Sequence, residues 1–353
     1  MQKAAVIGTT SWGITLAMML AGKGTEVRLW ARTEKEAKQY RENKLDPVRF
    51  PDISLLPQIV VTSRMDEAME DVNGVLLPVP SATMRQNVSR IAGHLSKSTL
   101  IISAAKGLEI GSNKRMTEVI AEEIDQRYRS NICALSGPQL AREVMRNLPA
   151  AAVIASDETS IARKAQRLLM APNFCVFTNS DIIGVELAGS LKNILALGAG
   201  IADGLGYGDN AKAAFMTRGL TEITALGMTM GANPLTFSGL AGLGDVIATC
   251  ASPLSRNHFV GVELAKGRPL AEIIDEMAEV AEGVNTTLVA QNLAEEHGLE
   301  MPITDKIHKV LYEGVDPVQA AAELMGGNVR HELSGRRWRL FSVFRRNRDS
   351  SGS

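Results

Sequence analysis

The stretch KAAVIGTTSWGITLAMMLAGKG, residues 3–24, decides the fold of the first half of this 353-residue chain. It predicts a buried strand, the short turn GTTSWG and a helix, which is the setting of a dinucleotide-binding turn in a Rossmann-like sheet. Gly8 and Gly13 occupy the first and third glycine positions of that turn, but Thr10 occupies the second. The helix N-terminus can still bind phosphate. The turn alone is equally compatible with a strand-turn-helix that binds no nucleotide.

Seven further apolar runs follow, separated by helical patterns: TEVRLW, QIVVT, GVLLPV, TLIISA, ICALSG, AAVIAS and FCVFT. Strands that alternate with helices predict a doubly wound sheet. After residue 180 the pattern is helical, with glycine turns and no strand alternation. We therefore predict an α/β protein with three parts: a Rossmann-like dinucleotide-binding domain (1–180), an all-helical substrate-binding domain (181–328) and a basic, flexible tail (329–353).

The end of the second predicted strand bears on the choice of dinucleotide. NAD sites usually place an acid there, about 20 residues after the glycine turn, whereas NADP sites use a cation. Here the strand VRLW is followed by Ala31 and Arg32, without an acid. This favours NADP over NAD, although an ordinary exposed arginine is the alternative for Arg32.

One lysine of the helical half is a candidate for proton transfer. Lys192 lies in VELAGSLKNILALGAG, and its neighbours at helical spacing, Ala188, Gly189, Leu195 and Ala196, carry no charge. Burial without a partner would lower the pKa of Lys192 and make it a general acid or base near neutral pH. The alternative is that the ammonium group reaches solvent from a core helix.

A polar, glycine-rich segment follows at residues 239–257, GLAGLGDVIATCASPLSRN. Asp245 and Thr249 are one helical turn apart and can face the same point. Ser252 and Pro253 predict a helix start. Free N–H groups, the helix dipole and a guanidinium in its first turn would make a phosphate site. That first turn holds Ser255, Arg256 and Asn257.

Two more loops are expected at the ligand-binding edge of the sheet, beyond the carboxyl ends of strands. ISAAKGLE places Lys106 there, where it can bind a phosphate or a carbonyl oxygen, and LSGPQLAREV places Gly137 and Gln139 at a helix start.

Composition excludes several classes of protein. The net charge of the whole chain is −1. The last 24 residues carry seven arginines against Glu332 and Asp349, which leaves the rest of the chain slightly acidic. Neither the tail nor the rest of the chain indicates a nucleic-acid-binding protein. Cys133, Cys175 and Cys250 show no metal-ligand or disulfide spacing. No uninterrupted apolar run spans a bilayer and no signal peptide is evident, so we expect a cytoplasmic protein without a metal.

The chain resembles the bacterial NAD(P)-dependent glycerol-3-phosphate dehydrogenases from about Lys3 to Gly326. The resemblance lies in KGLE at Lys106, in LSGP with AxEV after it, and in LAGSLKN, ADGLGYGDNAKAA, RGLTE, GLAGLGD, SPLSRN and AEGV. It implies reversible reduction of dihydroxyacetone phosphate to sn-glycerol 3-phosphate by NAD(P)H, for glycerophospholipid synthesis.

The resemblance also implies roles for individual residues. Lys192 would be the proton donor in reduction and the acceptor in oxidation. The substrate would contact Lys106, Gly137, Lys192, Asn193, Asp245, Thr249, Ser255, Arg256 and Asn257, and Gln139 is added as a candidate from its place at the strand end. The cofactor would contact Ser11, Trp12, Arg32, Lys106, Ala141, Arg256 and Glu282, and the glycine turn adds Gly8, Thr10 and Gly13 as candidates.

Two departures from the family pattern leave alternatives open. Thr10 replaces a glycine, and Gln139 with Leu140 replaces a small hydroxyl residue and an aromatic, so we expect an active enzyme with altered binding. A dehydrogenase of another phosphorylated or carboxylated hydroxy compound is one alternative, and a non-catalytic nucleotide-sensing scaffold is another. A homodimer is compatible with the resemblance.

The tail RHELSGRRWRLFSVFRRNRDSSGS mixes arginines with aromatic residues. Such a segment can bind an anionic membrane surface, or it can be a solubilising extension.

Overall fold

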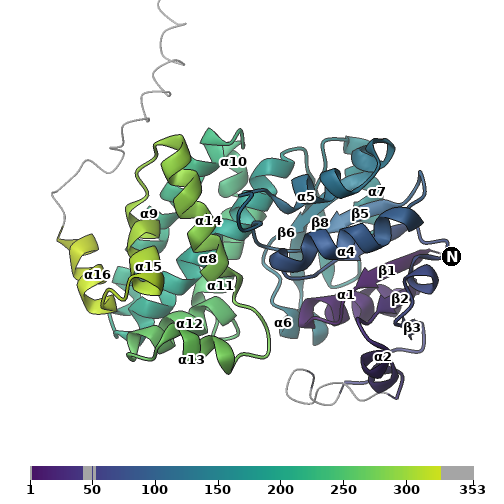
Figure 1. Cartoon of the computed structure of the whole chain (residues 1–353), viewed down its shortest axis with the longest axis horizontal. Helices are drawn as coiled ribbons and strands as arrows, with labels where there is room; N and C mark the ends of the chain where they lie inside the picture. Colours follow the sequence, from purple (N-terminus) through teal and green to yellow (C-terminus); the bar gives the residue numbers. More distant parts are fainter. Residues whose placement is uncertain (1, 43–49, 51–52, 327–353) are drawn as a thin grey trace, which may run out of the picture.

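Eight strands form one sheet in the first half of the chain, at the eight apolar runs (Figure 1). The computed structural model describes residues 2–42, 50 and 53–326. The strands are β1 (Lys3–Ile7), β2 (Glu26–Trp30), β3 (Ile59–Thr62), β4 (Gly74–Leu77), β5 (Leu100–Ser103), β6 (Ile132–Ser136), β7 (Ala150–Ala155) and β8 (Phe174–Asn179).

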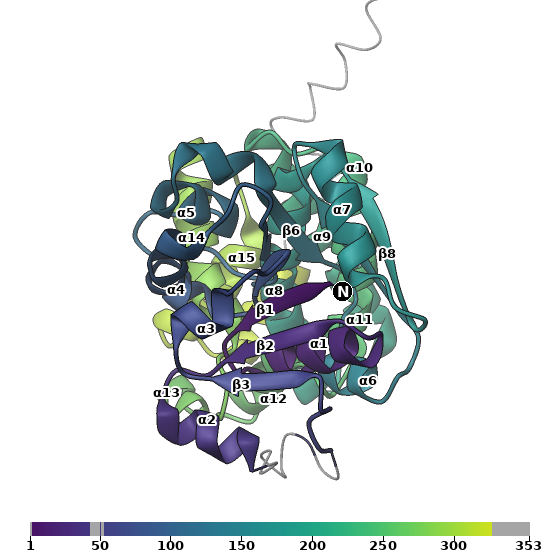
Figure 2. The same cartoon turned by 90° about the vertical axis from the view of Figure 1, so that its right-hand side faces the viewer.

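The strand order is β3-β2-β1-β4-β5-β6-β7-β8, and every neighbouring pair is parallel except β6 and β7. Figure 2 shows β3, β2 and β1 side by side in that order. Val6 at the centre pairs with Leu29 of β2 on one side and Leu76 of β4 on the other. The chain direction across the sheet therefore switches at β1, and the crevice beyond the ends of β1 and β4 is the expected ligand position.

Both faces of the sheet are covered by helices, because successive side chains of each strand alternate between two cores. In β1, Ala4 and Val6 pack with α1 and α7, whereas Ala5 and Ile7 pack with α3, α4 and α5. The helices of this half are α1 (Ser11–Gly22), α2 (Glu34–Arg41), α3 (Met65–Met69), α4 (Met84–Ile91), α5 (Met116–Glu123), α6 (Ala141–Met145) and α7 (Thr159–Leu169).

The second half packs around one long, almost completely buried helix, α8 (Ile182–Gly204). Asp181 caps α8 by accepting a hydrogen bond from Gly184 N at 2.8 Å. The other elements are α9 (Gly208–Thr229), α10 (Pro234–Phe237), a π turn (Leu240–Gly244), α11 (Asp245–Ala251), α12 (Arg256–Ala265), α13 (Leu270–Asp275), α14 (Glu282–His297), α15 (Pro302–Tyr312) and α16 (Pro317–Met325).

The predicted fold class, a Rossmann-like sheet followed by a helical half, is confirmed. Between Asp181 and Met325 the structure contains helices and turns and no strand. The tail at 329–353 lies outside the described residues.

Two segments, Ile182–Gly204 and Pro234–Ala251, are long and apolar enough to cross a membrane by length and composition. The first is α8, and almost all of it is buried inside the protein, as in the core helix of a folded domain. The second is broken into α10, the π turn and α11.

Candidate active site

A cavity of about 460 Å³ lies between the two halves, beyond the ends of β1, β4 and β5. Helices α8, α11, α12 and α14 contribute its other wall. The predicted residues that line it are Thr10, Ser11, Trp12, Lys106, Gln139, Ala141, Lys192, Asn193, Asp245, Thr249, Ser255, Arg256, Asn257 and Glu282. Four predicted residues are not part of its lining: Gly8, Gly13, Arg32 and Gly137.

Lys192 lies on the buried part of α8, and its ammonium group is paired. The residue is 5% exposed. Its Nζ donates to Asp245 Oδ1 at 3.0 Å and to the hydroxyl of Thr249. The prediction of an unpaired ammonium was therefore wrong. The neighbours on its own helix are uncharged, as expected, but the carboxylate comes from α11.

Buried Asp245 joins two lysines, buried Lys192 and partly buried Lys106, into one cluster. Its Oδ2 accepts a hydrogen bond from Lys106 Nζ at 2.7 Å, and its Oδ1 accepts from Lys192. Lys106 also donates to the carbonyl of Gly137, whose φ of +118° lies in the region that favours glycine. Burial acts to raise the pKa of Asp245, but the two ammonium groups outweigh it and hold that pKa below its ordinary value. With both lysines charged, the cluster has a net positive charge.

Lys106 has a lowered basicity in this cluster. Burial lowers its pKa to about 8, Asp245 opposes the shift, and the charge of Lys192 reinforces it. Lys106 therefore titrates near physiological pH, which the sequence pattern did not predict.

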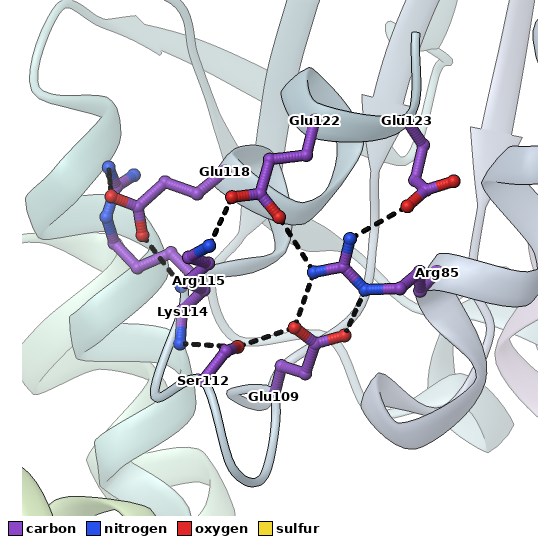
Figure 3. A network of polar contacts seen from close by, with 8 residues as sticks. All are labelled: Arg85, Glu109, Ser112, Lys114, Arg115, Glu118, Glu122 and Glu123. Carbon is purple, nitrogen blue, oxygen red and sulfur yellow. Dashed lines mark hydrogen bonds and ion pairs between the residues drawn. The ribbon is translucent and has the colours of Figure 1, made fainter.

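The loop that carries Lys106 is held by a network around Arg85, at the start of α4 (Figure 3). The Arg85 guanidinium donates to Glu109 at 2.9 and 2.7 Å, to Glu122 at 2.8 Å and to Glu123 at 2.8 Å. Glu109 is three residues after Lys106, whereas the other two acids belong to α5. The hydrogen bonds from Arg85 lower the pKa of Glu109. The network thus attaches the Lys106 loop to two helices of the sheet half.

Glu186 attaches α8 to the same region. Its carboxylate accepts hydrogen bonds from Arg115 Nη1 at 2.7 Å and from Thr117 N at 2.8 Å, at the start of α5. Burial raises the pKa of Glu186, although Arg115 and Thr117 oppose the shift. Because Glu186 is six residues before Lys192, the helix carrying Lys192 and the loop carrying Lys106 are both bound to α5.

The helix start near Arg256 lies three residues later than predicted. Ser255, not Ser252, is the N-cap of α12, and its hydroxyl accepts a hydrogen bond from His258 N at 3.2 Å. Ser252 and Pro253 instead form a turn, in which the Ser252 carbonyl accepts from Ser255 N at 3.1 Å. The side chain of Arg256 remains 48% exposed at the mouth of this site.

Asn193 and Asn257 form a chain of hydrogen bonds across the cavity wall. Gly283 N donates to Asn257 Oδ1, Asn257 Nδ2 donates to Asn193 Oδ1, and Asn193 Nδ2 donates to the Lys106 carbonyl, each at 2.9 Å. The chain connects the start of α14 to the Lys106 loop. Both amides line the cavity, as predicted, but part of their hydrogen bonding is internal.

The glycine turn keeps its form despite Thr10. Thr10 is the N-cap of α1 with φ −62°, a conformation that needs no glycine. Its hydroxyl accepts from Gly13 N at 3.0 Å and donates to the Pro78 carbonyl at 2.8 Å. A Cβ on Gly13 would lie 2.4 Å from the Gly8 carbonyl, so glycine is required there for the close approach of helix and strand. The residues present therefore fit a dinucleotide-binding turn.

Two carboxylates of the helical half contact this turn and its neighbour. Glu279 Oε1 accepts from Ser11 N at 2.7 Å, and its Oε2 lies 3.3 Å from Arg256 Nη1. Glu282, a predicted cofactor contact, accepts from Ser81 N at 2.8 Å. Burial raises the pKa of Glu282, while Ser81 and the charge of Arg256 oppose the shift. Sequence reasoning missed Glu279, because no motif indicates that residues 268 positions apart meet.

A third carboxylate corrects the argument made from Arg32. Glu36 Oε2 accepts from Arg32 N at 3.1 Å, and its Oε1 accepts from the Thr9 hydroxyl. An acid is therefore present at the end of β2. It comes from α2, four residues further along the chain, and the strand-end pattern did not reveal it.

Trp12 and Gln139 line the cavity, and one polar atom of each is buried without a partner among the described residues: Trp12 Nε1 and Gln139 Oε1. Gln139 Nε2 already donates to the Ser136 carbonyl at 2.8 Å. Buried polar groups are normally satisfied, so these two atoms are exceptions within the described part of the chain.

The described part of the chain contains no group of three or more His, Cys, Asp or Glu residues that is arranged to hold a metal ion. Cys133 and Cys250 are buried and Cys175 is exposed, and all three are free thiols.

A Rossmann-like sheet with a glycine turn, followed by a helical half that supplies a buried lysine, is the arrangement expected of a dinucleotide-dependent dehydrogenase. Comparison of the sequence with models of protein families identifies the family within this class. The NAD-dependent glycerol-3-phosphate dehydrogenase N-terminus matches residues 3–162, and the C-terminus of the same family matches residues 181–322. The chain belongs to the NAD-dependent glycerol-3-phosphate dehydrogenase family.

Individual relatives agree with this assignment. The chain is 56% identical over 349 residues to a glycerol-3-phosphate dehydrogenase [NAD(P)+] of Dehalococcoides mccartyi, covering 99% of this chain and 97% of that protein. It is 46% identical to the enzyme of the same name from Shouchella clausii, covering 94% and 98%. The crystal structure of glycerol-3-phosphate dehydrogenase from Coxiella burnetii superposes with a TM-score of 0.87 at 35% identity, covering 92% of this chain and 99% of that one.

Proposed function

We propose that the protein catalyses the reversible reduction of dihydroxyacetone phosphate to sn-glycerol 3-phosphate with NAD(P)H. The observation that carries the proposal is the buried Lys192–Asp245–Lys106 cluster, in a cavity that also reaches the N-terminus of α1. Family membership and the names of the close relatives support it. In this proposal residues 1–180 bind the dinucleotide and 181–328 complete the substrate site.

Lys192 is the proposed catalytic residue. The nicotinamide cofactor supplies a hydride to the ketone carbon when it is bound. A ketone that gains a hydride becomes an alkoxide, which needs a nearby positive charge and a proton. Lys192 Nζ provides both in reduction and accepts the proton in oxidation. Asp245 and Thr249 hold the ammonium group in one position through their hydrogen bonds.

The start of α12 is the proposed seat of the substrate phosphate. The free N–H groups of the first turn, the helix dipole and the Arg256 guanidinium favour an anion there. Ser255 and Asn257 line the same part of the cavity. Binding energy at the phosphate, away from the reacting carbon, holds the ketone against Lys192 and Lys106.

Gln139 is the proposed partner of a substrate hydroxyl group. Its Oε1 is a buried acceptor without a partner among the described residues, whereas its Nε2 is already bonded to Ser136. A hydroxyl donates to such an oxygen, and the unmet acceptor is then satisfied. Gln139 thereby supplies a hydrogen bond at the position where the sequence resemblance led us to expect a smaller hydroxyl residue.

The cofactor is proposed to bind along α1, at Ser11, Trp12 and the neighbouring Ala141, with Glu282 on the opposite wall. Gly8 and Gly13 shape the turn, and Lys106 and Arg256 lie where cofactor and substrate meet. The family and the relatives carry NAD or NAD(P)+ in their names.

Three further features remain predictions: a cytoplasmic location, a homodimer, and contact of the tail at 329–353 with an anionic membrane. Light scattering measures the dimer. Equal sedimentation of full-length and tail-deleted protein with anionic liposomes would exclude the membrane contact.

Initial rates with dihydroxyacetone phosphate and either NADH or NADPH test the proposed function. We expect nucleotide oxidation that depends on the ketone. Equal or faster rates with another phosphorylated or carboxylated ketone would support the alternative dehydrogenase. Thermal stabilisation by nucleotide without turnover of any ketone would support the non-catalytic scaffold, since a ligand at 100 times its Kd stabilises a protein by about 2.7 kcal/mol.

A further inference from the structure

Glu36 places a carboxylate at the carboxyl end of β2, beside the turn that leads into α1. Its Oε2 accepts a hydrogen bond from Arg32 N at 3.1 Å, and its Oε1 accepts one from the Thr9 hydroxyl. Arg32 is two residues beyond β2, and Thr9 is two residues beyond β1. One carboxylate therefore joins the two loops that border this corner of the nucleotide domain.

The position of this carboxylate is set by the helix that carries it. Glu36 lies in the first turn of α2, where the N-cap Thr33 accepts a hydrogen bond from Glu36 N at 3.2 Å. A negative charge is favoured at this end of a helix. Ala37 and Tyr40 are buried and pack α2 onto the core, whereas Arg32 exposes its side chain. The acid is thus fixed, and the nearby arginine is a long, solvent-exposed side chain.

The choice between NAD and NADP at this corner depends on whether Glu36 or Arg32 contacts the adenosine ribose of the nucleotide. In Rossmann-like sheets the adenosine ribose lies at the end of the second strand, where an acid accepts a hydrogen bond from the 2′-hydroxyl of NAD and an arginine accommodates the 2′-phosphate of NADP. A carboxylate is only an acceptor, so it suits a hydroxyl. A phosphate also brings about 1.5 to 2 negative charges at pH 7, which the carboxylate repels.

We propose that Glu36 directs this protein toward NAD(H), and that Arg32 accommodates the 2′-phosphate of NADP(H) only when the Glu36 carboxylate is removed. This reverses the preference expected from Arg32 alone. The inference rests on the proposed function, because it assumes that the nucleotide of that reaction binds along α1.

Calorimetric titration of the full-length protein with NAD⁺ and NADP⁺, without substrate, tests the assignment. We expect the wild type to bind NAD⁺ at least about tenfold more tightly than NADP⁺. Glu36→Gln should tighten NADP⁺ binding about tenfold, which corresponds to about 1.4 kcal/mol, and weaken NAD⁺ binding slightly. Adding Arg32→Ala to Glu36→Gln should abolish that gain in NADP⁺ binding. Adenosine 2′,5′-bisphosphate and ADP, which lack the nicotinamide, should show the same pattern.

Glu34→Gln is the matched control, since it removes the same charge from an exposed residue on the same helix. It should leave the ratio of the two dissociation constants unchanged. Glu36→Ala, which places a good helix former inside α2, replaces Glu36→Gln if thermal denaturation shows that the latter is unfolded.

Two results would overturn the assignment: wild-type protein that binds NADP⁺ as tightly as NAD⁺, or a ratio that neither Glu36 variant changes by more than about twofold. Either result, together with normal reduction of dihydroxyacetone phosphate, leaves the proposed function intact. Conversely, titrations that follow the expected pattern without any turnover of that ketone count against the function and support the role of Glu36.

Discussion

The two ends of the cavity differ in their charged groups and in how those groups are held. At the substrate end, Lys106 and Lys192 share Asp245 in a buried cluster. At the end near α1, the proposed nucleotide end, two carboxylates of the helical half contact backbone N–H groups: Glu279 contacts Ser11 and Glu282 contacts Ser81.

This difference shows which end is ready for its ligand. The cluster of Lys192, Asp245 and Lys106 is already assembled, because hydrogen bonds between protein groups hold it together. A substrate can bind beside these groups without breaking those hydrogen bonds. The N-terminus of α1 instead contacts Glu279, which a phosphate binding at Ser11 N would have to replace. We therefore expect substitutions at the substrate end to affect stability and chemistry, and substitutions at the nucleotide end to affect affinity.

The largest effect is expected for Asp245→Ala. The substitution leaves the buried ammonium group of Lys192 and the partly buried one of Lys106 without their carboxylate, and breaking a buried ion pair from one side typically costs about 3–5 kcal/mol. Urea unfolding of the variant and of Asp275→Ala, an exposed acid in α13, measures the difference. A loss no larger than that of the control would mean that Asp245 does not hold the cluster together.

Lys192→Met comes next. Methionine keeps most of the buried volume but removes the proton donor, so kcat should fall about 100-fold or more while the protein stays folded. Steady-state kinetics and a thermal midpoint separate the two effects. Loss of less than about tenfold would contradict the assigned role.

The pH profile of the wild type should carry the signature of Lys106. Because its pKa is about 8, kcat/KM should decline above that pH as the cluster loses a positive charge. Lys106→Arg keeps the charge at all accessible pH values, so the decline should move to higher pH. Initial rates between pH 6.5 and 9.5, measured at limiting ketone and saturating cofactor, test both.

The same lysine affects stability in a defined direction. Its pKa is lower in the folded state than its ordinary value of 10.5, so the unfolded chain binds more protons between about pH 8 and 10.5. The contribution of Lys106 to stability therefore rises with pH across that window and is lost as pH falls toward 8. Lys106→Met should flatten this rise in urea-unfolding measurements, and an equal rise in the variant would argue against the lowered pKa.

The smallest effect is expected for Glu279→Gln. A carboxylate at a helix N-terminus typically contributes 0.3–1 kcal/mol, so removing its charge should tighten cofactor binding about twofold to fivefold. Glu272→Gln, at an exposed acid of α13, is the control. Calorimetry at two salt concentrations measures the change, and unchanged affinity would show that Glu279 does not compete with the cofactor.

Most of the fold was predictable because its signals are local. Each of the eight strands coincides with an apolar run, since strands in a sheet with helices on both faces are mostly apolar. The helical half was recognisable from its period and its glycine turns. The placement of Asp245 and Thr249 on one helical turn was also confirmed, because it depends only on spacing within α11.

The contacts that set charge were not predictable from local pattern. The pairing of Lys192 with Asp245 joins residues 53 positions apart, and that of Glu279 with Ser11 joins residues 268 apart. Glu36 was not predicted, because it lies in α2 and its side chain extends back to the end of β2. The cap of α12 moved to Ser255 because Ser252 was used in a turn, and both serines satisfy the same local rule.

The chain of amides through Asn257 and Asn193 has a fixed direction. Gly283 N can only donate, so Asn257 must present its oxygen to it and its nitrogen to Asn193, which in turn presents its nitrogen to the Lys106 carbonyl. One backbone N–H thus sets the orientation of both side chains. Any remaining hydrogen of the two amide nitrogens can bond only to an acceptor, so a ligand that contacts either nitrogen must offer it one.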